Sequence, residues 1–320
     1  MHDVNVGMVG LGTVGGSTLR ILDENAKELE RKLGFKLWVR AAASLEIEAR
    51  SEKDGRLLTR DWHEVVEHPE VDIVVELVGG TTIAQQVIRG SLERGRPVVS
   101  ANKELLGLQG AELAELAAQH KASLNFEASV GGGIPVINAL REGICGDRIE
   151  ALYGILNGTS NFILTEMEKT AAPLQSILAE AQRLGYAEAN PTADVEGFDA
   201  RSKLAILTVF CFGARVPTDA IYREGITRLL PVDFGYAHKL GCTIRLVGAA
   251  QRVEDGLALY VRPILIPENA ILSKVQGSYN AVWVKGKYGE DTLYYGRGAG
   301  KPTGVAVVSD IMRAARDLRH

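Results

Sequence analysis

The chain has 320 residues, of which 46% are hydrophobic and 24% charged, and its formal net charge is −4. This length allows two domains, and the composition is that of an ordinary soluble globular protein. The acidic balance gives no reason to expect nucleic acid or an anionic membrane as a partner. No apolar stretch approaches the ~20 residues that a membrane-spanning helix needs.

The three cysteines lack CxxC spacing and cannot all pair with one another: Cys145, Cys211 and Cys242. Cys211 lies within an apolar run, and none of the three has a histidine near it in the sequence. We therefore expect reduced core thiols rather than disulfides or a catalytic thiolate. The N-terminus enters an apolar run at Val4, so we expect no signal peptide and a cytoplasmic protein.

Short apolar runs alternate with helical periodicities over roughly the first 130 residues. Strands are predicted over 4–9, 36–42, 71–80, 97–103 and 123–129, and helices over 10–33, 82–94 and 109–120. This alternation predicts a Rossmann-type, doubly wound parallel sheet, which we expect to occupy residues 1–130.

The pattern changes after the segment SVGGGIP, at 129–135. Helices are predicted near 136–143, 160–169, 173–184, 199–212 and 217–223, and strands near 149–156, 242–250, 257–266 and 280–287. We interpret residues 131–299 as an α+β domain with an open sheet for catalysis and dimerisation, and 300–320 as a helix that returns to the first domain. An open sheet surface favours a homodimer.

A glycine-rich motif follows the first predicted strand and opens a helix: Gly10, Leu11, Gly12, Thr13, Val14 and Gly15. The first glycine allows a tight turn, the second lets the backbone approach a pyrophosphate, and the third lets helix and strand pack closely. The N–H groups of the helix N-terminus then attract the phosphates. Strand, motif and helix agree, so the motif predicts a dinucleotide site rather than a mere turn.

The second predicted strand decides which dinucleotide is favoured. It reads LWVRAAAS, with Arg40 and no acid before Glu46. An NAD-selective site places a carboxylate at this strand end to hold the ribose hydroxyls. A guanidinium suits a 2′-phosphate, so NADP is favoured over NAD. The alternative is a surface arginine in an ordinary salt contact.

Two lysines are candidate catalytic groups. Lys103 follows the strand that ends in PVVSAN, at the edge where open α/β sheets bind ligands; the alternative is a lysine that merely starts a surface helix. Asp199 and Lys203 are four residues apart in a predicted helix, and an uncharged run from 204 to 212 follows. A lysine beside a buried run is partly desolvated, which lowers its pKa toward the range for proton transfer. The alternative is a plain helical ion pair.

Further polar groups surround this helix. Glu188 and Asp194 precede it and can hold an ammonium group of a substrate. In NGTSNF, Thr159 or Ser160 is expected to cap a helix. The segment FEASVGGGIP is either a glycine hinge or a loop of hard oxygen ligands beside Glu127 that suits a cation.

Together these segments resemble homoserine dehydrogenases. The matching pieces are GLGTVG, SANKELL, FEASVGGGIP, ILNGTSNFIL, GYAEANPTADVEGFDARSKL and GAGKPT, in the order of that family and over nearly the whole chain. The resemblance implies NAD(P)-linked interconversion of L-homoserine and L-aspartate 4-semialdehyde, on the route to threonine and methionine. The chain resembles a short form of the family, because many relatives carry a C-terminal regulatory domain beyond the helix that begins with GAGKPT.

The resemblance also implies roles for individual residues. Lys203 would donate and accept the proton at the substrate oxygen, and Lys103 would lie beside the nicotinamide and the same oxygen. Substrate would be held by Glu188, Asp199, Asp194, Tyr186, Thr159 and Gly158. Gly185 and Gly300 would line the cofactor, in addition to the glycine motif. A structural sodium or similar ion would be bound through Glu127, Val130, Gly132 and Ile134, by backbone carbonyls.

Two other functions remain as alternatives. A semialdehyde dehydrogenase that forms an acyl phosphate would need an activated cysteine beside a histidine, which the three cysteines do not offer. A non-catalytic NAD(P)-binding regulator would bind cofactor without turnover and would not need both Lys103 and Lys203.

Overall fold

A computed structural model describes residues 3–319, without the side chain of Lys53. It divides into two compact units: the first comprises the chain up to Gly133 together with the segment from Gly300 onward, and the second comprises Ile134–Ala299. No helix in the described part of the chain has both the length and the apolar character needed to cross a bilayer.

The first unit is built on a seven-stranded sheet in the order β3-β4-β2-β1-β5-β6-β7. Its strands are β1 (Val4–Val9), β2 (Leu37–Ala43), β3 (Ser51–Lys53), β4 (Arg56–Thr59), β5 (Ile73–Glu76), β6 (Val98–Ser100) and β7 (Leu124–Asn125). All neighbours are parallel except the antiparallel β3–β4 pair. The predicted parallel sheet is confirmed, whereas β3 and β4 were not predicted.

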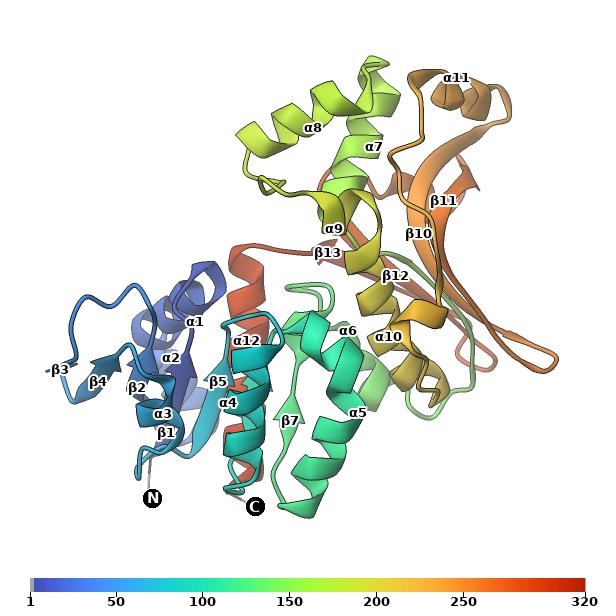
Figure 1. Cartoon of the computed structure of the whole chain (residues 1–320). Helices are drawn as coiled ribbons and strands as arrows, with labels where there is room; N and C mark the ends of the chain where they lie inside the picture. The colour runs from blue at the N-terminus through green and yellow to red at the C-terminus, as the bar shows by residue number, and fades with distance from the viewer. Residues whose placement is uncertain (1–2, 320) are drawn as a thin grey trace. The chain divides into compact units, whose positions relative to one another are not determined.

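Helices cover both faces of this sheet, as a doubly wound fold requires. They are α1 (Thr13–Glu24), α2 (Ala26–Leu33), α3 (Trp62–Val66), α4 (Thr82–Leu92), α5 (Lys103–Gln119) and α12 (Lys301–Asp317). One core joins α1, α2 and α12 to the sheet, with Met8 and Ile311 fully buried in it. A second core packs Val65 of α3 and Val87 of α4 on the other face. Figure 1 shows α12, red at the C-terminal end of the colour scale, lying among the blue and cyan elements of this unit.

Two helix predictions in the first unit differ from the structure. The predicted helix over 10–33 is two helices, because the backbone leaves the α-helical conformation at Asn25. The helix predicted over 109–120 begins earlier, at Lys103, where the Asn102 side chain accepts the N–H of Leu105 as an N-cap. The cap makes Lys103 the first helical residue after β6.

The second unit is built on a six-stranded sheet in the order β13-β12-β8-β10-β11-β9. Its strands are β8 (Ile149–Ile155), β9 (Tyr222–Arg223), β10 (Cys242–Val253), β11 (Gly256–Pro267), β12 (Tyr279–Gly286) and β13 (Asp291–Arg297). The pairs are antiparallel apart from β9–β11. The predicted α+β unit with an open sheet is confirmed, and β13 is an additional edge strand.

The helices of this unit follow the predictions except at three places. They are α6 (Val136–Asn138) continued by a π-helical turn (Ala139–Gly143), α7 (Gly158–Thr170), α8 (Leu174–Arg183), α9 (Thr192–Val195), α10 (Phe198–Phe212) and α11 (Pro231–Lys239). The helix predicted over 217–223 is wrong: a 3-10 turn (Thr218–Ala220) leads into β9, because Tyr222 pairs with Tyr260 of β11. Helices α9 and α11 were not predicted.

Asp147 holds the turn between β12 and β13. Its carboxylate accepts N–H groups of Arg148 at 2.7 Å, Tyr288 at 3.0 Å and Gly289 at 2.9 Å. Burial opposes the charged form, but these backbone donors outweigh it and lower the pKa of Asp147 below its ordinary 3.8.

The three cysteines are free thiols in the structure. Cys211 is buried, as predicted, and Cys242 is partly buried, but Cys145 is exposed and therefore not a core residue. Burial raises the pKa of Cys211 to about 12, so this thiol is unsuited to act as a nucleophile.

Candidate active site

The glycine motif forms a turn with one open position. A Cβ on Gly10, which has a φ of +100°, would lie 2.5 Å from the carbonyl oxygen of Leu77, and a Cβ on Gly15 would lie 2.0 Å from the Gly10 oxygen. Both close approaches require glycine. Nothing lies within 4 Å of a Cβ built on Gly12. That open side, above the first turn of α1 with Thr13 and Val14, fits the approach of a pyrophosphate.

Lys103 lies at the same carboxyl edge of the sheet. It is exposed and begins α5, directly after the N-cap residue Asn102. Strand β6, which leads to it, is two strands from β1 and its glycine turn. A polar group that the sequence analysis missed lies at this edge too: the buried carboxylate of Glu76, at the end of β5.

Arg40 does not lie at this edge, which corrects its predicted role. Its Nε is 2.9 Å from a carboxylate oxygen of Glu70, and Nη1 donates to the carbonyl of Gly55 at 3.3 Å. Glu70 precedes β5 and Gly55 precedes β4, so both lie at the amino ends of parallel strands. The guanidinium is thus directed to the edge opposite the glycine turn and forms the ordinary salt contact that was the alternative.

In the second unit, Lys203 and Asp199 form a buried ion pair on α10. Their charged atoms are 2.7 Å apart, and their side chains are only 9% and 3% exposed. The Lys203 ammonium also donates to the carbonyl of Leu156 at 2.8 Å. The predicted geometry of acid and base on one buried helix is confirmed.

Asn157 joins this pair to a second carboxylate. Its Nδ2 donates to Asp194 at 2.6 Å and to Asp199 at 2.8 Å, while its Oδ1 accepts the N–H of Ser160 at 2.8 Å. Asn157 is therefore the N-cap of α7, and the predicted cap by Thr159 or Ser160 is wrong. Asparagine is a preferred N-cap residue, a signal that identifies the cap but not the contacts with the two acids.

The remaining predicted substrate residues lie around this network without joining it. The Thr159 hydroxyl donates to the carbonyl of Tyr186 at 2.6 Å, which links the start of α7 to the segment before α9. Gly158 packs so closely that a Cβ would lie 2.8 Å from the Ser278 oxygen. The Glu188 residue is exposed, and its backbone carbonyl accepts a hydrogen bond from the Gln182 side chain.

The two predicted cofactor glycines belong to different units. Gly185 follows α8 with a φ of +76°, and nothing lies within 4 Å of a Cβ built on it; Gly300 precedes α12 with a φ of +85°. Both left-handed conformations favour glycine.

The predicted cation loop belongs to the first unit up to Gly133 and is buried from Glu127 to Gly132. Glu127 and Val130 are 2% and 0% exposed, and the Glu127 N–H donates to the buried carboxylate of Asp310 at 2.7 Å. Gly132 has a φ of +58°. Ile134 opens the second unit, where its carbonyl accepts the N–H of Val136. No group of three or more His, Cys, Asp or Glu side chains in the described chain is arranged to hold a metal.

Glu196, next to this network, has a structural contact that the sequence did not reveal. Its carboxylate accepts the Thr227 hydroxyl at 2.8 Å and pairs with Arg223 at 3.5 Å, so it attaches the segment after β9 to α9. Arg201 lies over the Phe198 ring at 5.3 Å. Burial, followed by repulsion from Arg223, lowers the pKa of Arg201.

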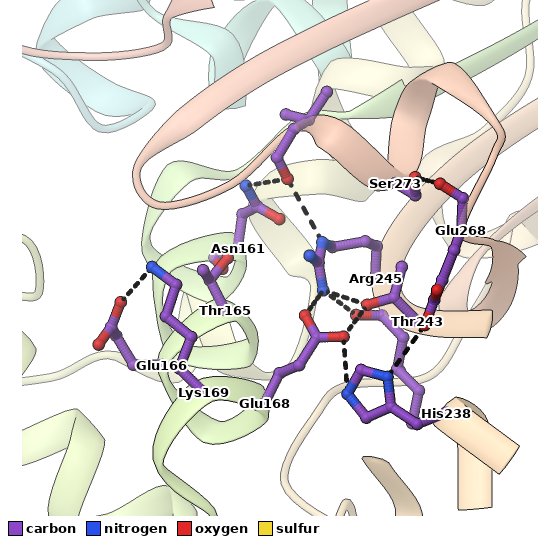
Figure 2. A network of polar contacts seen from close by, with 12 residues as sticks. Asn161, Thr165, Glu166, Glu168, Lys169, His238, Thr243, Arg245, Glu268 and Ser273 are labelled. Atoms are coloured by element: carbon purple, nitrogen blue, oxygen red, sulfur yellow. Dashed lines mark hydrogen bonds and ion pairs between the residues drawn. The ribbon is translucent and has the colours of Figure 1, made fainter. Parts of the chain in front are cut away.

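A separate polar network surrounds Arg245 of β10, which is fully buried (Figure 2). Its Nη1 donates to Glu168 at 2.9 Å and to Thr243 at 2.7 Å, and Nε donates to the carbonyl of Val275 at 3.3 Å. His238 lies between Glu168 and Glu268, at 3.6 Å and 3.0 Å. The network joins α7, α11 and β10.

A parallel sheet with a glycine turn in one unit and a buried lysine–carboxylate network in the other define an NAD(P)-dependent dehydrogenase. Family models support this class: residues 10–127 match "Homoserine dehydrogenase, NAD binding domain" and residues 135–312 match "Homoserine dehydrogenase". The chain belongs to the homoserine dehydrogenase family, the oxidoreductases of the aspartate pathway that interconvert L-homoserine and L-aspartate 4-semialdehyde.

Individual relatives agree with the family assignment. The chain is 45% identical over 318 residues to a homoserine dehydrogenase of Neisseria gonorrhoeae, covering 99% of this chain and 73% of that protein. The crystal structure of a homoserine dehydrogenase from Thiobacillus denitrificans matches with a TM-score of 0.94 and 46% identity, over 99% of this chain and 74% of that one. A hyperthermophilic archaeal homoserine dehydrogenase in complex with NADPH matches with a TM-score of 0.83 and 25% identity, over 99% and 98%.

Proposed function

We propose that the network around Asp199 binds the ammonium group of the substrate and that Lys203 transfers the proton. The observation that carries this proposal is the convergence of two carboxylates: the Asn157 amide donates to half-buried Asp194 and to buried Asp199, and Lys203 pairs with Asp199. Carboxylates gathered beside the start of α7 attract a cationic amino group. Glu188, exposed in the preceding segment, adds a third carboxylate for the same group.

Lys203 is held for proton transfer by contacts with Asp199 and Leu156. Asp199 and the Leu156 carbonyl keep its ammonium in one position on a rigid, buried helix. In the direction of homoserine oxidation the neutral amine form of Lys203 accepts the hydroxyl proton and becomes the ammonium, and in reverse that ammonium donates a proton to the developing alkoxide. Thr159 and Tyr186 position the start of α7, and Gly158 leaves room beside it.

Lys103 is proposed to polarise the same substrate oxygen from the cofactor side. NADP or NAD, when bound, accepts or supplies the hydride. Gly10, Gly12, Thr13, Val14 and Gly15 would hold its pyrophosphate, and Gly185 and Gly300 would line it.

The test is oxidation of NADPH with aspartate 4-semialdehyde, followed by absorbance. Lys203→Ala is expected to lower kcat by about 100- to 10,000-fold, the range for loss of a general acid–base group. Lys169→Ala is the matched control, because Lys169 also pairs with an acid of its own helix but is 52% exposed. Turnover that survives Lys203→Ala would remove it as the proton carrier, and absence of turnover in the unaltered protein would favour a cofactor-binding regulator.

We propose that NADP is preferred over NAD. The reason is the residue type at the end of β2 and not the position of Arg40. The strand ends at Ala43 and is followed by Ser44, without the carboxylate that holds the ribose hydroxyls in NAD-selective sites. The similar archaeal enzyme solved with NADPH agrees with this choice. Ser44→Asp is expected to lower kcat/KM with NADPH and to raise it with NADH. An unchanged ratio would contradict the proposal.

We propose further that the carbonyls of Glu127, Val130, Gly132 and Ile134 bind sodium or a similar ion. Backbone oxygens beside a buried acid suit such a hard cation. A rise in melting temperature with NaCl that is absent with choline chloride would support this site, and equal effects of both salts would contradict it.

The open face of the second sheet is proposed to form a homodimer. Tyr153, Ile264, Trp283 and Leu293 line an apolar hollow of about 490 Å³ on this face. A second copy would cover it. Elution at the monomer mass in gel filtration would contradict the proposed homodimer, as would a dimer that is unaffected by Trp283→Asp.

In the cell, we propose that the enzyme works in the cytoplasm and supplies homoserine for threonine and methionine.

A further inference from the structure

Glu76 is a fully buried carboxylate in the middle of the dinucleotide-binding sheet. It is the last residue of β5, and its side chain is 0% exposed. In register, it pairs with Val9 of β1 on one side and with Ser100 of β6 on the other. It therefore lies at the carboxyl edge, between the strand that leads to the glycine turn and the strand that leads to Lys103.

The Glu76 carboxylate accepts three hydrogen bonds within the described part of the chain. One oxygen accepts the N–H groups of Val78 at 2.8 Å and Gly79 at 3.2 Å, and the other accepts the Ser100 hydroxyl at 2.7 Å. A buried acid is costly unless it is satisfied in this way. The side chain thus fixes the loop after its own strand to the end of the next strand.

The contacts continue from Ser100 to the helix that carries Lys103. The Ser100 oxygen accepts the N–H of Asn102 at 3.1 Å, and Asn102 caps α5 through Leu105 at 3.1 Å. The Asn102 amide also donates to the carbonyl of Gly80 at 2.7 Å, in the loop after β5. The hydrogen bonds form a closed ring through two loops, and Lys103 follows the ring residue Asn102 directly.

The same loop is in contact with the glycine turn. The Leu77 N–H donates to the Val9 carbonyl at 2.7 Å, and a Cβ on Gly10 would lie 2.5 Å from the Leu77 oxygen. Any displacement of the loop after β5 therefore reaches the turn that is to hold the pyrophosphate.

We propose that Glu76 is a positioning residue for the reaction: it holds the loops after β5 and β6 together and so sets Lys103 relative to the glycine turn. The part that concerns Lys103 rests on the proposed role of that lysine. The part that concerns the glycine turn is measured by cofactor binding alone.

The substitution Glu76→Gln tests the polarity of the ring with little change in shape. A glutamine oxygen still accepts from Val78 and Gly79, but its amide then faces Ser100 as a donor. The Ser100 oxygen already accepts from Asn102 and would lose its own acceptor. Ser100→Ala breaks the ring at the same link from the other side.

The experiment compares Glu76→Gln, Ser100→Ala and the double variant by NADPH Kd, by kcat and KM with aspartate 4-semialdehyde, and by melting temperature. Glu76→Gln is expected to lower kcat by up to about 100-fold, because small displacements of catalytic groups have effects of this size, and to weaken NADPH binding. The kcat and the NADPH Kd of the double variant are expected to stay within about twofold of those of Glu76→Gln, because both substitutions break the same link between Glu76 and Ser100.

Ser91→Ala is the matched control for stability. Ser91 is a fully buried serine of the same unit, but its hydroxyl donates to the Val87 carbonyl within α4. Equal kcat and NADPH Kd for Ser100→Ala and Ser91→Ala would overturn the proposal, and a selective loss in Ser100→Ala would support it even if Glu76→Gln fails to fold. The variant Lys103→Ala separates this proposal from the proposed role of Lys103. If Lys103→Ala retains turnover, the role of Lys103 fails. If Glu76→Gln binds NADPH with the same Kd as the unaltered protein, the role of Glu76 is overturned.

Discussion

Replacement of Glu168 by glutamine is expected to destabilise the second unit more than any other single change of a charge in the network of Figure 2. Glu168 is the acid that pairs with Arg245, and their side chains are 12% and 1% exposed. Without this carboxylate, the guanidinium stays buried with neutral partners, Thr243 and the carbonyls of Ile244 and Val275. Water cannot replace the lost charge at a fully buried side chain.

Breaking a buried ion pair by removal of one partner destabilises a protein by about 3–5 kcal/mol. The lower end applies here, because Glu168 is slightly exposed and Arg245 keeps its hydrogen bonds to neutral groups. At about 2–4 °C for each kcal/mol in a unit of this size, a loss of ~3 kcal/mol lowers the melting temperature by ~6–12 °C.

The assay is scanning calorimetry of the unaltered protein and its variants. Glu268→Gln is the control, because Glu268 contacts His238 in the same network but is 53% exposed, and a change at the surface is expected to alter stability by less than about 1 kcal/mol. The double variant Glu168→Gln, Arg245→Met should recover part of the loss, since it removes the unpaired charge. A melting temperature for Glu168→Gln equal to that of Glu268→Gln would refute the reasoning.

Three further changes have defined outcomes. Gly15→Ala brings a Cβ within 2.0 Å of the Gly10 oxygen, so NADPH affinity should fall by about tenfold or more; titration of NADPH fluorescence measures it, and an unchanged Kd would contradict the turn geometry. Asp147 has a lowered pKa, so its contribution to stability is present above pH 3.8 and disappears as the pH falls through the lower folded value; acid unfolding of Asp147→Asn should lose this dependence, and identical acid curves would count against it. Iodoacetamide at pH 8 should alkylate exposed Cys145 and spare Cys211, as mass spectrometry of peptides would reveal, and early labelling of Cys211 would show that its burial is wrong.

Elements with strong local patterns were predictable. The apolar run before the glycine motif, the uncharged run of α10 and the long strands β10 and β11 lie where periodicity and composition indicate. The structure of segment 217–223 was not predictable, because β9 forms only through its pairing with β11, which lies far along the chain. Helix α11 was missed because it is short and Gly235 interrupts its helical pattern.

The site divides in the same way. Asp199 and Lys203 were identified because their contact is local, at a spacing of one helical turn. Asn157 and Glu76 were missed because their partners come from distant segments, which bring Asp194 to one and Ser100 to the other. Arg40 was misassigned because residue type and strand position do not tell toward which edge a long side chain extends.

Helix α12 has a consequence for how this protein is made. The helix covers one face of the sheet that begins with β1, and Val307, Ile311 and Ala314 are fully buried there. During synthesis, the ribosome releases this helix only after the entire second unit, Ile134–Ala299, has left the exit tunnel. Until α12 has left the ribosome, the face of the first unit's sheet that holds Val6 and Met8 lacks the cover of this helix. A chaperone that shields this sheet face would act before α12 arrives.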